Sequence, residues 1–198
     1  VVVVFGSERG IRSSGGRRVR VVAGPDKFRG TASAAEAASA IASAVVSRDG
    51  TAVEVPMADG GEGLLDVLGG PDRTTEVTGP LGSPVTAGWR LSDGTAVVEM
   101  ARASGLVLAG GPDENRPLDA TTTGVGELLR HAVELGARRV IVGMGGSATT
   151  DGGLGALDAM GPVARYLGVE ILVACDVRTR FTEAAEVFAP QKGATSAQ

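Results

Sequence analysis

Residues 140–155 read VIVGMGGSATTDGGLG, in which a β-branched apolar run leads into a loop that contains six glycines. The run 140–142 predicts a buried strand, and the apolar residues of 154–160 predict a short helix after the loop. Glycine permits positive φ and carries no Cβ, so successive N–H groups can converge on one anion. The stretch therefore predicts an α/β fold in which a loop between a strand end and a helix N-terminus binds a phosphate group.

Common phosphate motifs describe this loop only in part. A P-loop requires a lysine after its last glycine, and no lysine occurs between Gly143 and Asp151. The dinucleotide fingerprint G-x-G-x-x-A is met by Gly143, Gly145 and Ala148, but the residues TTDGG that follow delay the helix that should begin there. An NAD-type site and a turn that merely connects two elements are therefore alternatives.

The composition indicates a folded protein that acts on small molecules. Of 198 residues 43% are apolar and the net charge is −4, so the chain lacks the basic footprint expected for binding nucleic acid or an anionic membrane. The apolar runs 1–5 and 171–175 are too short to span a bilayer. One cysteine and one histidine exclude a disulfide framework and a His-rich metal site. We expect Cys175 to lie in the core, His131 to be structural or exposed, and the protein to be cytoplasmic.

The sequence predicts two lobes after a loose N-terminal stretch. Residues 1–16 end in a Ser/Gly-rich run and are interpreted as a loose arm or an added remnant. Residues 17–73 predict the first part of an α/β lobe, a β-α-β unit with its strand, alanine-rich helix and second strand at 18–23, 34–47 and 52–55. Ser33 and Glu36 form an S-x-x-E capping box at the start of that helix.

From residue 74 the periodicity changes, and residues 74–198 predict a second, mixed α/β lobe. The words TTEVT, PVTAGWRL and TAVVEMA read as three short strands joined by hairpin turns. Residues 123–135 have apolar side chains at helical spacing, and Gly136 ends that helix. Residues 140–142 and 169–174 then predict further strands.

Carboxylates next to glycine dominate the candidate chemistry. Several of them near one phosphate loop suggest Mg²⁺ and a substrate hydroxyl, because Mg²⁺ binds few carboxylates together with phosphate oxygens and water. Each alone also suits a turn or a helix N-cap. Lysine and arginine in GPDKFRGT and APQKGAT can neutralise phosphate or bind a substrate carboxylate, although such charges are often merely solvated.

Six words in sequence order, MADGGEG, VTGPLG, VEMARASGL, ATTTGVGELL, VGMGGSATTDGGLGAL and CDV with FAPQKGAT, resemble the glycerate kinase family in its bacterial glycerate 2-kinase type. The similarity runs from about residue 19 to 195. It implies an ATP- and Mg²⁺-dependent enzyme that phosphorylates D-glycerate. It also implies two α/β lobes, one Rossmann-like or flavodoxin-like and the other inserted into it, with the active site between them.

The family words also show where this chain departs from the pattern. In the PDSFKG-like word, Lys27 takes the usual serine position and Arg29 the usual lysine position, and Thr150 replaces asparagine in GGSATNDGG. The chain is shorter than many relatives between residues 161 and 169, and the segment that follows PQKGAT in the family is absent. We therefore expect weak or no turnover from this chain alone, with Lys192 on a loosely held end, unless a homodimer supplies the missing strands.

The resulting hypothesis is a glycerate kinase, or a fragment of one, that transfers the ATP γ-phosphoryl group to O2 or O3 of D-glycerate. The alternatives are an NAD-type oxidoreductase, for which only Glu170 stands where the ribose carboxylate should be, and a non-catalytic module that binds a nucleotide or sugar acid. The catalytic candidates are Asp59, Asp151 and Lys192, and the metal candidates are Asp59 and Asp151. The candidates for substrate or phosphate binding are Asp26, Lys27, Arg29, Gly60, Gly61, Glu62, Glu99, Ser104, Gly145, Gly146, Ser147, Thr149 and Asp176.

Overall fold

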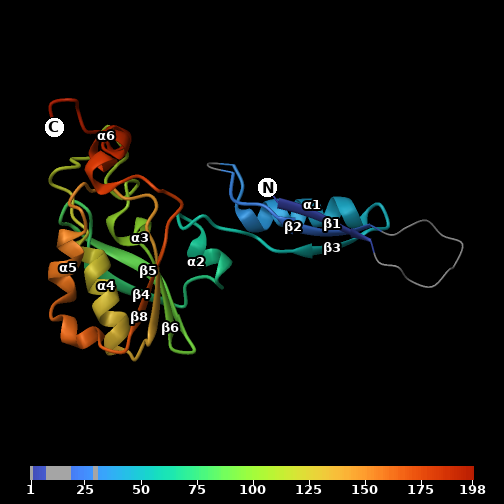
Figure 1. Cartoon of the computed structure of the whole chain (residues 1–198), viewed down its shortest axis with the longest axis horizontal. Coiled ribbons are helices and arrows are strands. Elements are labelled where there is room, and N and C mark those ends of the chain that lie inside the picture. Colours follow the sequence, from blue (N-terminus) through green and yellow to red (C-terminus); the bar gives the residue numbers. More distant parts are fainter. Residues whose placement is uncertain (1, 8–18, 29–30) are drawn as a thin grey trace, which may run out of the picture. The chain divides into compact units, whose positions relative to one another are not determined.

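A computed structural model describes residues 2–7, 19–28 and 31–198 of the chain (Figure 1). The chain divides into two compact units, Val1–Asp59 and Gly60–Gln198. Residues 60–73, which we expected with the first lobe, belong to the second unit. The short helix α2 (Leu64–Val67) lies in this segment, and its two leucines are buried.

The first unit contains a three-stranded sheet in the order β1-β2-β3 with one helix, α1 (Ala34–Val46). Strands β2 (Val19–Gly24) and β3 (Thr51–Glu54) are parallel, and α1 connects them as the sequence predicts. The predicted capping box is present, since the Glu36 N–H donates to Ser33 Oγ at 3.2 Å and the Ser33 N–H donates to Glu36 Oε2 at 2.8 Å.

The N-terminal stretch was expected to be a loose arm, but part of it is a strand. Residues Val2–Ser7 form β1, which pairs antiparallel with β2 from Val2 opposite Gly24 to Ser7 opposite Val19. A β-branched run favours strand pairing, and β2 offers it a free edge. The other residues of that arm lie outside the described part of the chain.

The second unit contains a mixed five-stranded sheet in the order β4-β5-β6-β7-β8. The first three strands are antiparallel neighbours, as the hairpin words predict, and β6, β7 and β8 run parallel. Parallel neighbours need crossover connections, which helices supply here. The strands are β4 (Arg73–Thr78), β5 (Pro84–Ser92), β6 (Thr95–Glu99), β7 (Arg139–Gly143) and β8 (Glu170–Ala174).

The core of the second unit lies between its sheet and the paired helices α4 (Thr123–Glu134) and α5 (Leu154–Met160) (Figure 1). Trp89 and Leu128 are fully buried in it, and the Trp89 indole N–H donates to Thr75 Oγ1 at 2.9 Å. Gly126 lets the two helices approach closely, because a Cβ there would lie 2.2 Å from the carbonyl oxygen of Ala156. Strand β8 is an exposed edge, and Cys175 after it is exposed, so the prediction that Cys175 belongs to the core is wrong.

Short helical elements complete the second unit, and two of them, α3 and η3, contain the site candidates Ser104 and Lys192. They are α3 (Ala101–Ser104), η1 (Val163–Tyr166), η2 (Phe181–Glu183), α6 (Ala184–Phe188) and η3 (Pro190–Lys192). Among the helices of the described residues, none combines the length and the apolar character that crossing a membrane requires.

Candidate functional site

The glycine-rich loop follows β7, and its backbone is held by the end of α3 and the segment after it. The Leu106 N–H donates to the Gly146 carbonyl at 2.8 Å, and the Ala148 N–H donates to the Ser104 carbonyl at 2.9 Å. Thr150 Oγ1 donates to the Pro117 carbonyl at 2.8 Å. These bonds fix the loop before any ligand binds, which is the preorganisation that an anion site needs.

The ammonium group of Lys192 lies directly on this loop. Its Nζ donates to Ser147 Oγ at 2.7 Å and to the Thr149 carbonyl oxygen at 2.5 Å. Burial lowers the pKa of the Lys192 amine, and the nearby negative charge of Asp151 opposes this effect in part. The segment that carries Lys192, expected to be loosely held, therefore lies on the loop, and it brings a positive charge to residues 45 and 43 positions away in sequence.

Asp151 organises the loop through several hydrogen bonds. Its Oδ2 accepts from the Thr122 N–H at 2.8 Å, the Thr122 hydroxyl at 2.7 Å and the Gly155 N–H at 3.2 Å, while Oδ1 accepts from the Gly153 N–H at 3.0 Å. Burial raises the pKa of Asp151, but the bonds from Thr122, Gly153 and Gly155 outweigh it and the pKa lies below its usual value. The carboxylate joins the start of α4 to the start of α5, and Oδ1 keeps more free acceptor capacity than Oδ2.

The word GGEG packs against the same loop. The Gly145 N–H donates to the Gly60 carbonyl at 3.1 Å, and a Cβ on Gly145 would lie 2.4 Å from Gly61 Cα. A Cβ on Gly146 would lie 3.4 Å from Glu62 Oε1, so this carboxylate borders the loop. The structure thus brings Gly60, Gly61 and Glu62 to the loop, as the sequence hypothesis requires.

The C-terminal end of β8 reaches the same place. The Met144 N–H donates to the Ala174 carbonyl at 3.1 Å, and a Cβ on Gly60 would lie 2.5 Å from that carbonyl oxygen. The side chain of Asp176, two residues beyond Ala174, is exposed. Three separated words therefore meet at the carboxyl ends of the parallel strands, the usual position of ligand sites in α/β sheets.

Three residues proposed to bind substrate or phosphate have their polar atoms turned inward instead. Glu99 is 2% exposed, and its carboxylate accepts from the N–H groups of Gly63 and Leu65 and from Arg102 Nε at 2.9, 2.8 and 3.0 Å. Thr149 Oγ1 donates to the Ala120 carbonyl at 2.7 Å and accepts from the Asp151 N–H. Ser104 is fully buried, and its hydroxyl has no partner among the described residues. The Glu99 and Thr149 side chains thus bind neighbouring protein groups.

The first unit carries the remaining candidates. Lys27 Nζ lies 3.5 Å from Asp59 Oδ1, and Asp26 Oδ1 accepts from the Lys27 N–H at 2.6 Å. A cation and two carboxylates thus lie together within this unit. Arg29 lies outside the described residues.

Sequence reasoning missed Asn115, which is buried behind the loop. Its Nδ2 donates to the carbonyl oxygens of Ala148 and Lys192, both at 2.8 Å. Asn115 is the only asparagine in the chain, and that scarcity, within the otherwise turn-like word GPDENRP, is the signal that could have drawn attention to it.

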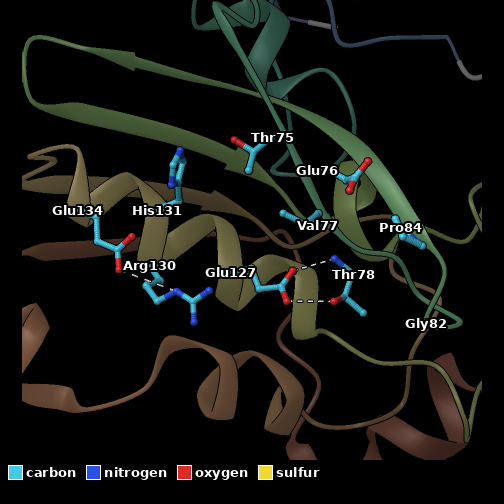
Figure 2. A pocket seen from close by; sticks show the side chains of 10 residues that line it. All are labelled: Thr75, Glu76, Val77, Thr78, Gly82, Pro84, Glu127, Arg130, His131 and Glu134. Carbon is cyan, nitrogen blue, oxygen red and sulfur yellow. Dashed lines mark hydrogen bonds and ion pairs between the residues drawn. The ribbon is translucent and has the colours of Figure 1, made fainter.

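A separate pocket of about 350 Å³ lies between α4 and strands β4 and β5 (Figure 2). Glu127 accepts there from the Thr78 N–H and hydroxyl at 2.7 and 3.0 Å. His131 lines this pocket and contacts Trp89 edge-to-face at 5.9 Å between ring centroids. Its position among core and pocket residues agrees with a structural role.

The carboxylates of the site do not form a metal-binding cluster of their own within the part of the chain that the structure describes. Among the described residues no group of three or more histidine, cysteine, aspartate or glutamate side chains is arranged to hold a metal ion. Mg²⁺ that arrives with a nucleotide needs only one or two protein carboxylates, because phosphate oxygens and water supply the other ligands. Asp151 Oδ1, which accepts one hydrogen bond, from the Gly153 N–H, is compatible with that modest requirement.

Comparison with known proteins gives the family. The model of the glycerate kinase family matches residues 21–165. The chain belongs to the glycerate kinase family. The NAD-type alternative is disfavoured by this match and by α5, which begins only at Leu154 and not directly after Ala148.

Several named relatives share this similarity. The chain is 39% identical to glycerate 2-kinase of Escherichia coli K12 over 219 residues, and 40% identical to glycerate kinase of Bacillus subtilis 168 over 217 residues. These alignments cover 90% of this chain but 57% and 56% of the relatives.

A solved structure agrees with the sequence comparisons. A crystal structure of a candidate glycerate kinase 2 from Salmonella typhimurium LT2 has a TM-score of 0.74 and 37% identity. The match covers 89% of this chain and 58% of that one. The chain therefore spans rather more than half the length of the relatives it matches.

Proposed function

We propose that the protein is an ATP-dependent glycerate kinase that transfers the γ-phosphoryl group to a hydroxyl of D-glycerate. The observation that carries this proposal is the Lys192 ammonium seated on the glycine-rich loop at Ser147 and Thr149. A fixed cation beside a small-residue loop suits the triphosphate of a nucleotide. Glycerate is proposed as the phosphoryl acceptor because the relatives are named glycerate kinases.

Phosphoryl transfer depends mainly on positioning and charge neutralisation. In the proposed reaction the loop and Lys192 bind phosphate oxygens, and Mg²⁺, held by those oxygens with Asp59 or Asp151 Oδ1, would neutralise further charge. The glycerate hydroxyl oxygen forms the new bond to the γ-phosphorus, the bond to the ADP oxygen breaks, and the hydroxyl proton passes to a carboxylate. The candidates for this proton acceptor are Asp59 and Asp151.

ADP release tests the proposal when it is measured against a panel of hydroxy acids with an enzyme of the relatives' full length that contains this chain, because little turnover is expected from the chain alone. We expect release only when ATP, Mg²⁺ and D-glycerate are all present. Equal release without glycerate, or tight NAD binding without ATP binding, would refute it. Binding of ATP and glycerate without turnover would favour the non-catalytic module instead. We also propose a cytoplasmic location, where the exposed thiol of Cys175 stays reduced.

A further inference from the structure

Asn115 joins two segments that are far apart in the sequence. One amide nitrogen donates to Ala148 in the glycine-rich loop and to Lys192 near the end of the chain, each at 2.8 Å. Because both acceptors are carbonyl oxygens, they require the nitrogen side of the amide to face them. The residue is 8% exposed, so its bonds are shielded from water.

The segment that carries Lys192 has little apolar anchoring of its own. None of the residues in η2, α6 and η3 is buried. Gly193 packs so closely on residue 112 that a Cβ would lie 2.1 Å from the Pro112 carbonyl oxygen. The bond from Asn115 and this packing therefore both restrain the Lys192 backbone, and a segment with few buried contacts opens easily when such restraints are removed.

We propose that Asn115 is a positioning residue that fixes the Lys192 ammonium on the glycine-rich loop by binding the Lys192 carbonyl and the loop with the same amide group. That the placement of the Lys192 ammonium matters for phosphate binding rests on the proposed function. That Asn115 fixes this placement does not depend on the proposed function. Without Asn115 the amine moves from Ser147 and the Thr149 carbonyl into water.

The lysine content of the chain makes this movement measurable. Lys27 and Lys192 are the only lysines, so a Lys27→Arg chain labelled with ¹³C-lysine gives the signal of one Cε carbon. Burial holds the pKa of the Lys192 amine below its usual value. Release into water removes this cause, and the pKa rises toward that of a free lysine side chain.

The experiment titrates this Cε signal in the Lys27→Arg chain and in the same chain with Asn115→Leu or Asn115→Ser. Leucine keeps the number and branching of the side-chain heavy atoms, serine shortens the side chain, and neither can donate hydrogen bonds to both carbonyls. Thr150→Val is the matched control, because it removes a bond between the same loop and residue 117 without touching Lys192. Circular dichroism confirms that each variant is folded.

We expect either Asn115 variant to raise the Lys192 pKa by about 0.5 or more on the pH scale, with no change in Thr150→Val. An unchanged pKa in a folded Asn115 variant would overturn the proposal. If neither variant folds, ¹⁵N-asparagine labelling of the unsubstituted chain marks this one residue, and its two amide signals must titrate with Lys192; independence of the two overturns the proposal. No nucleotide or glycerate is present, so loss of the proposed activity is judged separately by ADP release.

Discussion

At the scale of single residues, the polar side chains around the glycine-rich loop have different roles. Asp151 accepts bonds from Thr122, Gly153 and Gly155, and so ties the loop to two helices. Lys192 is held from the backbone side and directs its charge onto the loop. Asp151 therefore supports the structure of the site, while Lys192 supplies its positive charge.

Asp151→Asn should destabilise the fold. An asparagine amide group places N–H donors against the N–H groups that the carboxylate now accepts, so we expect a loss of about 2 kcal/mol in the free energy of unfolding, the scale of hydrogen bonds to a charged group. Urea unfolding measures this loss. Asp158→Asn, on the exposed side of α5, is the control and should change stability little.

The stability contributed by Asp151 should depend on pH. Its folded pKa lies below that of the unfolded chain, about 3.9, so the contribution is complete above that value and is lost as the pH falls through the folded pKa. As the pH falls below about 4, the unfolding midpoint of the unsubstituted chain should therefore decrease more steeply than that of Asp151→Asn. Parallel curves would contradict this assignment.

In an enzyme of the relatives' full length that contains this chain, Lys192→Met and His131→Ala should separate a functional cation from a structural imidazole. Removing the ammonium removes a charge that contacts phosphate in the proposed reaction, so kcat/KM should fall about 10²-fold or more. His131 lies against Trp89 in the separate pocket, and its loss should leave kcat/KM within about a few-fold. Equal damage in both variants would show that the charge on the loop has no special importance.

The sequence could identify the loop and the words that meet there, but not which polar atoms are satisfied. The hydrogen-bond partners of these polar side chains come from distant segments. Asp151 accepts from Thr122, and Glu99 accepts from residues 63 and 65. Local patterns contain no information about such pairings. Asn115 escaped notice for the same reason, since its two acceptors lie 33 and 77 residues away.

At the scale of elements, the contact between α4 and α5 depends on Gly126. Alanine is the better helix former by about 1 kcal/mol, so Gly126→Ala would stabilise an isolated helix. In this structure the new Cβ would lie 2.2 Å from the Ala156 carbonyl oxygen, and the helices must separate. We therefore expect a lower thermal midpoint, measured by calorimetry, despite the gain in propensity. A raised midpoint would show that α5 moves aside at no cost.

Periodicity predicted most elements of both units. The capping box, α1, the hairpin strands, α4 and β7 all lie where the patterns place them. The sequence does not predict strand β1, because the Ser/Gly-rich residues that follow its valine run are typical of a loose segment. The apolar run of β8 was read correctly as a strand, yet its exposure depends on sheet order, which an apolar pattern does not reveal.

At the scale of the whole molecule, β8 presents apolar side chains at a sheet edge. Ile171, Leu172 and Val173 are 38, 42 and 58% exposed. Exposed apolar edge strands promote association between chains. Leu172→Lys should raise the protein concentration at which light scattering begins.

A matched charge elsewhere tests that explanation. Thr182→Lys adds the same charge at an exposed position away from the sheet. Either substitution brings the net charge of −4 closer to zero, which by itself does not improve solubility. A benefit confined to Leu172→Lys would identify the strand edge as the cause, and an equal benefit from both would exclude it.

The burial of Trp89 makes the two units optically distinguishable. The only tryptophan and the only tyrosine, Trp89 and Tyr166, both belong to the second unit, so the first unit has no chromophore of either kind. Tryptophan emission therefore follows the melting of one unit, while far-ultraviolet dichroism follows the helices and strands of both. Coincident transitions would mean that the units melt cooperatively, and separate ones would give each unit its own stability without any label.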